Sequence, residues 1–355
     1  MIALVALTTT TIGVIGLVIV VAGWVIYGVF NVVGGRKSVG SEIELAPNRK
    51  PYYDDEQLEG PRLERVQLWG VVLLAITVVV LPLYWIFEPS RQAGAQEGWD
   101  NRFASWGSQL FASTGDGGFN CAGCHGGMAG VGGEAPFTVT DPVTGEVQAV
   151  NWKAPAVNTV FYKFDEDEVR FILNYGRPFS PMSPWGLVGG GPMNTQQIDN
   201  LIAYMKSIQI PRENCVEGED PLTCSTGNLP AEIQNDIQAA AERAVADGEA
   251  ATIGEALFNL DLGAGAYSCA RCHTLGWSYG QPGVSGQGAF GWNLTGGSVN
   301  AHFADQAQLV NFIKEGSEFG RLYGRNGQGS GRMPGFGSLL TDEQIDAILE
   351  YVRSL

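Results

Sequence analysis

Two five-residue motifs in this chain combine cysteine and histidine at a fixed spacing. They are C-A-G-C-H at 121–125 and C-A-R-C-H at 269–273. Two cysteines with a histidine directly behind them could form half a zinc site, a redox-active dithiol or an attachment site for haem. A closed zinc site requires four ligands, and no second cluster of cysteine or histidine follows either motif. A thioredoxin-like dithiol requires a βαβ context, which the sequence lacks.

Covalent attachment of haem accounts for both motifs. Thiols at positions i and i+3 can reach vinyl groups on adjacent pyrroles, and the imidazole at i+4 then lies beneath the iron. The sequence therefore predicts two covalently bound haem c groups. The predicted attachment residues are Cys121, Cys124, Cys269 and Cys272, and the predicted proximal iron ligands are His125 and His273.

Methionine is the predicted sixth iron ligand, because both motif histidines are already used and the chain holds only three histidines. Met182 follows His125 at nearly the same distance along the chain as Met333 follows His273. Each methionine adjoins a proline, which can stiffen a loop over the haem face. Ligation by Met and His closes both axial positions and favours electron transfer over substrate binding.

Other distal ligands remain open at this point. Met193, in the stretch GGGPM, could replace Met182, and His302 could ligate one of the irons. Met205 falls in an apolar helical stripe that is typical of a core. Met128 is too close to His125 in the sequence to cross the ring.

The two motifs belong to one unit that occurs twice, around 102–212 and 248–355. WGSQLF precedes the first motif and IGEALF the second. Both copies close with an amphipathic helical pattern, over 195–208 and 341–355. Thr195 and Thr341 are the expected N-caps of these closing helices. Gly107 and Gly254 occupy matching places in the opening helices, which indicates close helix–helix approach. The predicted fold class is all-α.

The segment between the copies carries Cys215 and Cys224 in CVEGEDPLTC. Outside the cytoplasmic membrane such a pair favours a small disulfide loop, and a free or metal-binding pair is the alternative. Residues 231–248 predict a helix that packs between the two units.

Two charge-free runs, 1–33 and 66–87, each exceed the ~20 residues that span a bilayer as a helix. No Lys or Arg precedes Arg36, so the first run is read as an uncleaved anchor rather than a signal peptide. Six of the 21 basic residues lie between the runs, which predicts a cytoplasmic loop with the N-terminus and the haem units outside. The two runs predict a two-pass membrane protein. We expect a bacterial cell membrane, because the covalent attachment of haem requires a ligation system on the export side.

The predicted domains are as follows: transmembrane helix 1–34, cytoplasmic loop 35–65, transmembrane helix 66–88, first haem domain 89–212, linker 213–247 and second haem domain 248–355.

The outer region is strongly acidic. Residues 88–355 hold 15 Lys and Arg against 30 Asp and Glu, a formal charge of −15. This balance argues against nucleic acid as a partner and suits a basic electron-transfer protein.

Each unit resembles a class I cytochrome c domain, in its G-x-x-L-F opening helix, its C-x-x-C-H motif, its late Met-Pro or Pro-Met loop and its closing helix with an aromatic. The chain as a whole resembles the cytochrome c subunit of an actinobacterial-type quinol–cytochrome c reductase, although that family usually places its membrane helix after the haem domains. It also resembles the dihaem subunit of cbb-type haem–copper oxidases, which shares the order of two helices followed by two haem domains.

These resemblances imply an electron relay from a quinol-oxidising, bc-type complex toward a terminal oxidase, with a cytochrome b and a Rieske protein or an oxidase core as partners. The alternative is an electron-entry subunit of a haem–copper oxidase, and a further one is a dihaem peroxidase or dehydrogenase subunit. No independent catalytic site is expected on the chain.

Overall fold

The computed structural model describes residues 16, 18–19, 21–30, 33, 60–140, 144–177, 180–222, 224, 226–260, 268–281, 283–288, 290–317 and 332–355. The chain divides into two compact units, Met1–Pro89 and Ser90–Leu355. Most of the predicted loop 35–65 lies outside the described residues, as does much of the predicted helix 1–34. The basic residues on which the predicted orientation depends fall largely in that part.

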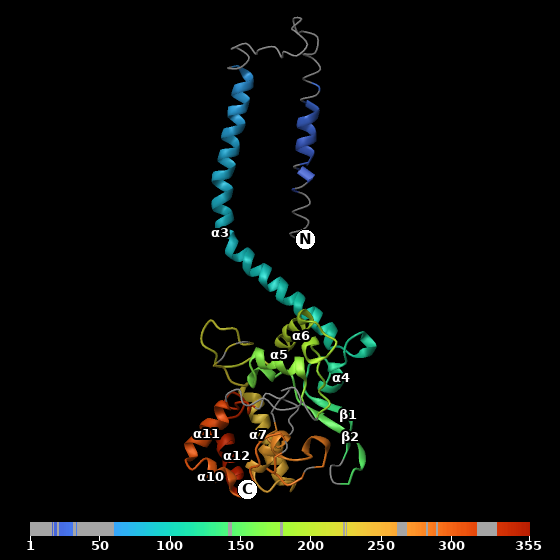
Figure 1. The fold of residues 1–355 in the computed structure, drawn as a ribbon. Helices are drawn as coiled ribbons and strands as arrows, with labels where there is room; N and C mark the ends of the chain where they lie inside the picture. Colours follow the sequence, from blue (N-terminus) through green and yellow to red (C-terminus); the bar gives the residue numbers. More distant parts are fainter. Residues whose placement is uncertain are drawn as a thin grey trace, which may run out of the picture. The chain divides into compact units, whose positions relative to one another are not determined.

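Helix α3, Pro61–Phe111, contains the second of the two charge-free runs (Figure 1). Its stretch Leu63–Phe111 is long and apolar enough to cross a membrane, with a mean hydropathy of 2.5 in its most apolar window, and a shorter apolar helical segment covers Val21–Phe30. In the described part of the chain, α3 alone passes this test. The structure therefore holds one long apolar helix suited to anchoring, and a second spanning helix stays a prediction.

The elements of Ser90–Leu355 follow in two series. After α3 come η1 (Thr114–Asp116), α4 (Cys121–His125), β1 (Gly133–Thr140), β2 (Val147–Ala154), η2 (Val160–Tyr162), α5 (Glu166–Tyr175), η3 (Leu187–Gly189) and α6 (Thr195–Ser207). The second series is α7 (Ala231–Ala246), α8 (Ile253–Asn259), α9 (Ala270–His273), η4 (Trp277–Tyr279), α10 (Ser298–His302), α11 (Gln306–Glu315) and α12 (Asp342–Ser354). Below, residues 90–212 are called the first half and residues 226–355 the second half.

The opening and closing helices cross at a glycine in both halves, as the sequence predicted. A Cβ on Gly107 would overlap the carbonyl of Asn200 and the Cβ of Tyr204 in α6. A Cβ on Gly254 in α8 would likewise overlap the carbonyl of Ala347 and the Cβ of Tyr351 in α12. Only glycine allows this approach of the two backbones. The same tyrosines pack on Phe111 and Phe258, with ring centroids 5.2 Å and 5.4 Å apart.

Both closing helices begin with a capping box, in which a side chain at the N-cap and one three residues later satisfy each other's backbone N–H. In α12 the N-cap is Thr341, as predicted, and its partner is Gln344. In α6 the N-cap is Asn194, with Gln197 as partner, and Thr195 is the first helical residue. The prediction of Thr195 as N-cap was therefore wrong by one position, because Asn194 is an equally good capping residue.

The all-α prediction is wrong in one place, although the fold is mostly helical. Strands β1 and β2 pair antiparallel, with Gly133 opposite Ala154 and Thr140 opposite Val147. The stretches FTVT and VQAV are rich in β-branched residues and flank a Pro- and Gly-containing connection, which is a hairpin signal. The surrounding glycines and prolines made this segment read as loop. Figure 1 shows the hairpin beside α4.

Each half has its own apolar core. The first core gathers around Phe111, Ile198 and Leu201, and the second around Phe258, Ile345 and Leu349. Helix α7 was expected between the two units, but its buried residues Ile237, Ala241 and Ala244 belong to the second core. The predicted disulfide between Cys215 and Cys224 is present in the segment that connects the halves.

Candidate haem sites in a shared cavity

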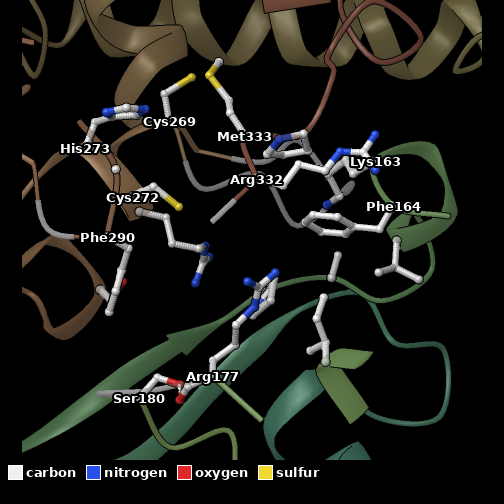
Figure 2. A pocket seen from close by; sticks show the side chains of 18 of the residues that line it. Lys163, Phe164, Arg177, Ser180, Cys269, Cys272, His273, Phe290, Arg332 and Met333 are labelled. Carbon is white, nitrogen blue, oxygen red and sulfur yellow. Dashed lines mark hydrogen bonds between the residues drawn. The ribbon is translucent and has the colours of Figure 1, made fainter. Parts of the chain in front are cut away.

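One cavity of about 620 Å³ brings the two predicted haem sites together. Its wall includes both pairs of attachment cysteines, both motif histidines and both predicted distal methionines: Cys121, Cys124, His125 and Met182 from the first half, and Cys269, Cys272, His273 and Met333 from the second. Figure 2 shows the second set grouped at one end of the cavity. The sequence predicted two separate sites, and the fold makes them neighbours.

Each motif histidine is oriented by a backbone carbonyl. Nδ1 of His125 lies 2.8 Å from the carbonyl oxygen of Pro155, and Nδ1 of His273 lies 2.7 Å from that of Trp292. Because a carbonyl only accepts, Nδ1–H donates and Nε2 keeps the lone pair that a metal ligand needs. Burial lowers the pKa of both rings; for His125 the positive charge of Arg271 lowers it further. Both rings are therefore held neutral, as iron ligation requires.

Glycine completes the second histidine site. Gly291 lies against the ring of His273, and a Cβ there would approach Cε1 to 2.6 Å. Any side chain would push the ring out of position, so the close approach requires glycine. The ring of Phe258 packs on the same histidine, with centroids 6.5 Å apart.

The two methionine loops have the same geometry. Helices α5 and α11 end at Gly176 and Gly316, with φ of 70° and 78°, which favours glycine. In both places a Cβ would overlap the carbonyl oxygen of the following methionine, Met182 or Met333. That carbonyl accepts a backbone hydrogen bond from the residue after the glycine, at 2.8 Å in the first half and 2.9 Å in the second. The fold thus fixes both methionines by one repeated turn.

The alternative distal ligands lie differently. Met193 is fully buried in the first core and is not part of the cavity wall. His302 reaches the cavity but is exposed, and its ring stacks on Trp292 with centroids 6.2 Å apart. Met205 belongs to the first core and also touches the cavity. The geometry therefore favours Met182 over Met193 as a ligand in the first half.

The cysteine environments suit thioether bonds. Burial raises the pKa of Cys121 to about 11 and that of Cys269 to about 12. A thioether carries no charge, so a buried sulfur in that form avoids the cost that a thiolate would carry. In the described part of the chain, no group of three or more His, Cys, Asp or Glu is placed to hold a metal ion. The residues therefore fit covalent haem and do not form the alternative zinc site.

Contacts between the halves close the cavity around these residues. Trp152 of β2 packs on Tyr279, with centroids 5.6 Å apart, and the ammonium of Lys153 lies 4.7 Å from the ring centroid of Trp277. On another side Arg332 forms an ion pair with Glu168 at 2.9 Å and a longer one with Asp165 at 3.5 Å. Glu168 is completely buried. The hairpin and α5 of the first half therefore hold the second half in place.

Sequence reasoning missed two kinds of site residue. The carbonyls of Pro155 and Trp292 were not identified, although A-P-A-V at 154–157 and G-W-N-L at 291–294 occupy equivalent places in the repeat. The basic residues that line the cavity were missed as well. Their positions follow no periodic pattern, so the sequence carries no comparable signal for them.

Comparison with known proteins gives one match, which lies in the second half. Residues 249–352, less than a third of the chain, match the family model described as cytochrome C oxidase, cbb3-type, subunit III. No curated protein and no solved structure gives a match. The matched region and the geometry of its site indicate a c-type cytochrome domain, which implies covalently bound haem c and a role in electron transfer.

Proposed function

We propose that this chain is a membrane-anchored dihaem c-type cytochrome that relays electrons through two His/Met haems. The observation that carries the proposal is the shared cavity, whose wall holds a complete set of two cysteines, one histidine and one methionine from each half. Because both sets line one cavity, electron transfer between them needs no partner protein between the sites.

The chain's own residues bind, orient and shield the two groups. Haem iron, when bound, changes reversibly between its ferric and ferrous states and so takes up and releases single electrons. The four cysteines would attach the two groups covalently. His125 and His273, whose rings are oriented by backbone carbonyls, would each supply one iron ligand, and Met182 and Met333 would each supply the other. Apolar side chains such as those of Phe164 and Phe336 line the cavity and would surround the two groups.

The proposed position in metabolism is between a quinol-oxidising, bc-type complex and a terminal oxidase. The acidic outer region and the anchoring helix α3 support a partner at a membrane surface. A second candidate is the dihaem electron-entry subunit of a haem–copper oxidase, and the match of residues 249–352 to a cbb3-type oxidase subunit model favours it. In both cases we propose a bacterial cell membrane as the location, with the haem domains on the outer side.

The first experiment counts haems in the purified full-length protein. We expect two covalent haem c groups per chain by the pyridine haemochrome assay, and two six-coordinate spectra that do not change when carbon monoxide is added to the reduced protein. One haem per chain would refute the dihaem proposal. Binding of carbon monoxide at one haem would favour a peroxidase instead.

The second experiment identifies the complex. Gentle solubilisation of membranes that express a tagged chain, followed by identification of co-purifying subunits, should recover respiratory partners. Recovery of a cytochrome b and a Rieske protein supports the reductase, and recovery of an oxidase core without them supports the oxidase. Purification of the chain alone after chemical cross-linking would contradict both.

A further inference from the structure

Four basic side chains line the cavity at the junction of the two halves. They are Lys163 and Arg177 from the first half and Arg271 and Arg332 from the second, and we call them the cation cluster. Figure 2 shows three of them, Lys163, Arg177 and Arg332, on the same cavity as Cys272 and His273. Among the described residues, no aspartate or glutamate belongs to the cavity wall. The whole chain holds 37 acids and only 21 Lys and Arg, so this lining runs against its composition.

Two members of the cluster, one from each half, are almost completely buried. Lys163 is only 4% exposed and Arg271 only 8%. A negative charge placed beside a buried cation stabilises it. The pKa of Lys163 is lowered to about 7, mainly by burial and in addition by the positive charge of Arg271 from the other half. Two like charges from different halves are thus held within each other's field.

The arginines are held in place by contacts with protein groups, and those of Arg332 and Arg271 include residues of the other half. Arg332 is fixed by its ion pairs with Glu168 and Asp165. Arg271 donates to the carbonyl of Lys153, and its guanidinium lies 5.3 Å from the centroid of Trp277. The guanidinium of Arg177 lies 5.5 Å from the centroid of Phe164. The cluster is therefore organised by the fold before any ligand enters.

An anion that enters this cavity must also be largely apolar, because the remaining wall consists mainly of aliphatic and aromatic side chains. A porphyrin group that carries carboxylates on one edge has this combination. Guanidinium groups pair with carboxylates through strong, charge-assisted hydrogen bonds. Residues from both halves take part, so the cluster is not confined to one of the two sets of predicted haem residues.

We propose that the cation cluster binds the propionate carboxylates of both haem groups, so that the two haem sites share one set of counter-charges. This inference rests on the proposed dihaem function. It has a measurable consequence, because a positive charge near a haem favours the ferrous over the ferric state. Removal of one cluster charge should therefore lower the reduction potentials of both haems, including the one bound by the other half.

The test is a spectroelectrochemical titration of the full-length, haem-loaded protein with Arg177→Gln and Arg332→Gln. Arg243→Gln, an exposed residue of α7 away from the cavity, is the control with the same change in net charge. Each cluster variant should lower the ratio of reduced to oxidised haem at a fixed potential roughly tenfold for one haem and at least about threefold for the other. Tenfold corresponds to about 59 mV for a one-electron couple. The control should change both ratios by less than about 1.5-fold.

Two further measurements keep the result interpretable. Resonance Raman spectra should show a shift in the propionate bending modes in the cluster variants, which a purely structural effect at the iron would leave in place. Arg332→Lys, which keeps the charge beside Met333, should restore most of the potential. Repeating the titration in the Met182→Ala and Met333→Ala backgrounds assigns each potential to its haem.

Several outcomes would overturn the proposal. A shift confined to one haem in both cluster variants would show that the charges are not shared. Potentials that change with phosphate concentration in the wild type, and no longer do so in the variants, would show that a free anion occupies the cluster instead. A haem count below two refutes the proposed function itself, whereas two haems with unshifted potentials refute only this inference.

Discussion

The first half has a longer chain segment than the second between its proximal histidine and the carbonyl that orients it. Pro155 lies 30 residues after His125, whereas Trp292 lies only 19 after His273. In the first half most of the additional chain forms the β1–β2 hairpin. In the second half the described residues of the same interval form only η4 and loops. The two sites are otherwise built from the same crossing helices, the same histidine–carbonyl contact and the same methionine turn.

This difference shows how a repeated unit acquires an interface. The hairpin supplies Trp152, Lys153 and Gln148, which contact Tyr279, Trp277 and Gln281 of the other half. An insertion in one copy therefore creates the surface that closes the cavity, while the helices that hold each haem site are unchanged. The family model matches the copy that lacks the hairpin.

Replacement of the predicted distal methionines should have the largest effect of the changes considered, and it tests whether the two halves are equivalent. Met182→Ala and Met333→Ala should each abolish the far-red sulfur–iron band of one haem and lower its potential on the order of 100 mV, because axial ligation is a main determinant of potential. Met193→Leu is the matched control and should keep both bands. Visible absorption and redox titration measure this, and loss of a band in Met193→Leu with both bands intact in Met182→Ala would reverse the assignment.

A glycine-to-alanine substitution at the helix crossing should lower the unfolding free energy equally in both halves. Gly107→Ala and Gly254→Ala each place a methyl group on a neighbouring backbone carbonyl, and we expect each to cost about 3 kcal/mol of unfolding free energy. Gly98 is the control in the same helix α3, because nothing lies within 4 Å of a Cβ added there. Gly98→Ala should be neutral or stabilise the protein by up to about 1 kcal/mol. Chemical denaturation followed at the haem bands measures the unfolding free energy of each variant. Equal unfolding free energies in all three variants would contradict the close approach of the opening and closing helices at Gly107 and Gly254.

The ion pair between the halves provides a smaller effect. Glu168→Gln removes the buried charged partner of Arg332 and leaves the longer contact to Asp165 in place. We expect this change to lower the unfolding free energy by about 2 kcal/mol, because the half-buried guanidinium of Arg332 loses its nearer charged partner.

The matched control is Glu232, an exposed residue in α7. Glu232→Gln should change the unfolding free energy by less than about 0.5 kcal/mol, as is usual for surface substitutions. Limited proteolysis of the segment between the halves should become faster only in Glu168→Gln. Unaltered proteolysis would show that the pair does not hold the halves together.

The smallest expected effect concerns a network of surface ion pairs between α5 and α6 in the first half. Among the described ion pairs, the second half has no such network. The hydrogen bond from Lys206 to Glu166, at 2.5 Å, is the main cause of a lowered pKa of that carboxyl, and Arg170 adds to it. A lowered folded-state pKa contributes stability above the unfolded-state value and loses it as the pH falls. Glu166→Gln should therefore cost about 0.5 kcal/mol at neutral pH. The cost should shrink as the pH falls below the ordinary carboxyl pKa of 4.5. Thermal unfolding across this pH range checks it, and a cost that grows toward acid pH would contradict it.

Much of each candidate haem site could be predicted because the residues that define it lie close together in the sequence. The spacing within C-x-x-C-H places three side chains on a single turn, and the repeat fixes which methionine and which glycine correspond in the two copies. The hairpin was harder to predict, because short strands between glycines and prolines carry a weak signal and gain their stability from packing against the other half. The N-cap at Asn194 was missed for a local reason, since two adjacent polar residues can both cap.

The sequence by itself predicted the cysteines and histidines of the two motifs, the helical repeat and the disulfide between Cys215 and Cys224, because each depends on residue type and short-range spacing. Tertiary structure alone decided that the two candidate sites face one cavity and that Lys163, Arg177, Arg271 and Arg332 line that same cavity. These residues are distant along the chain, and only the packing of the hairpin and α5 against the second half brings them together. Burial and mutual charge are properties of that packing, so no pattern in the sequence could reveal them.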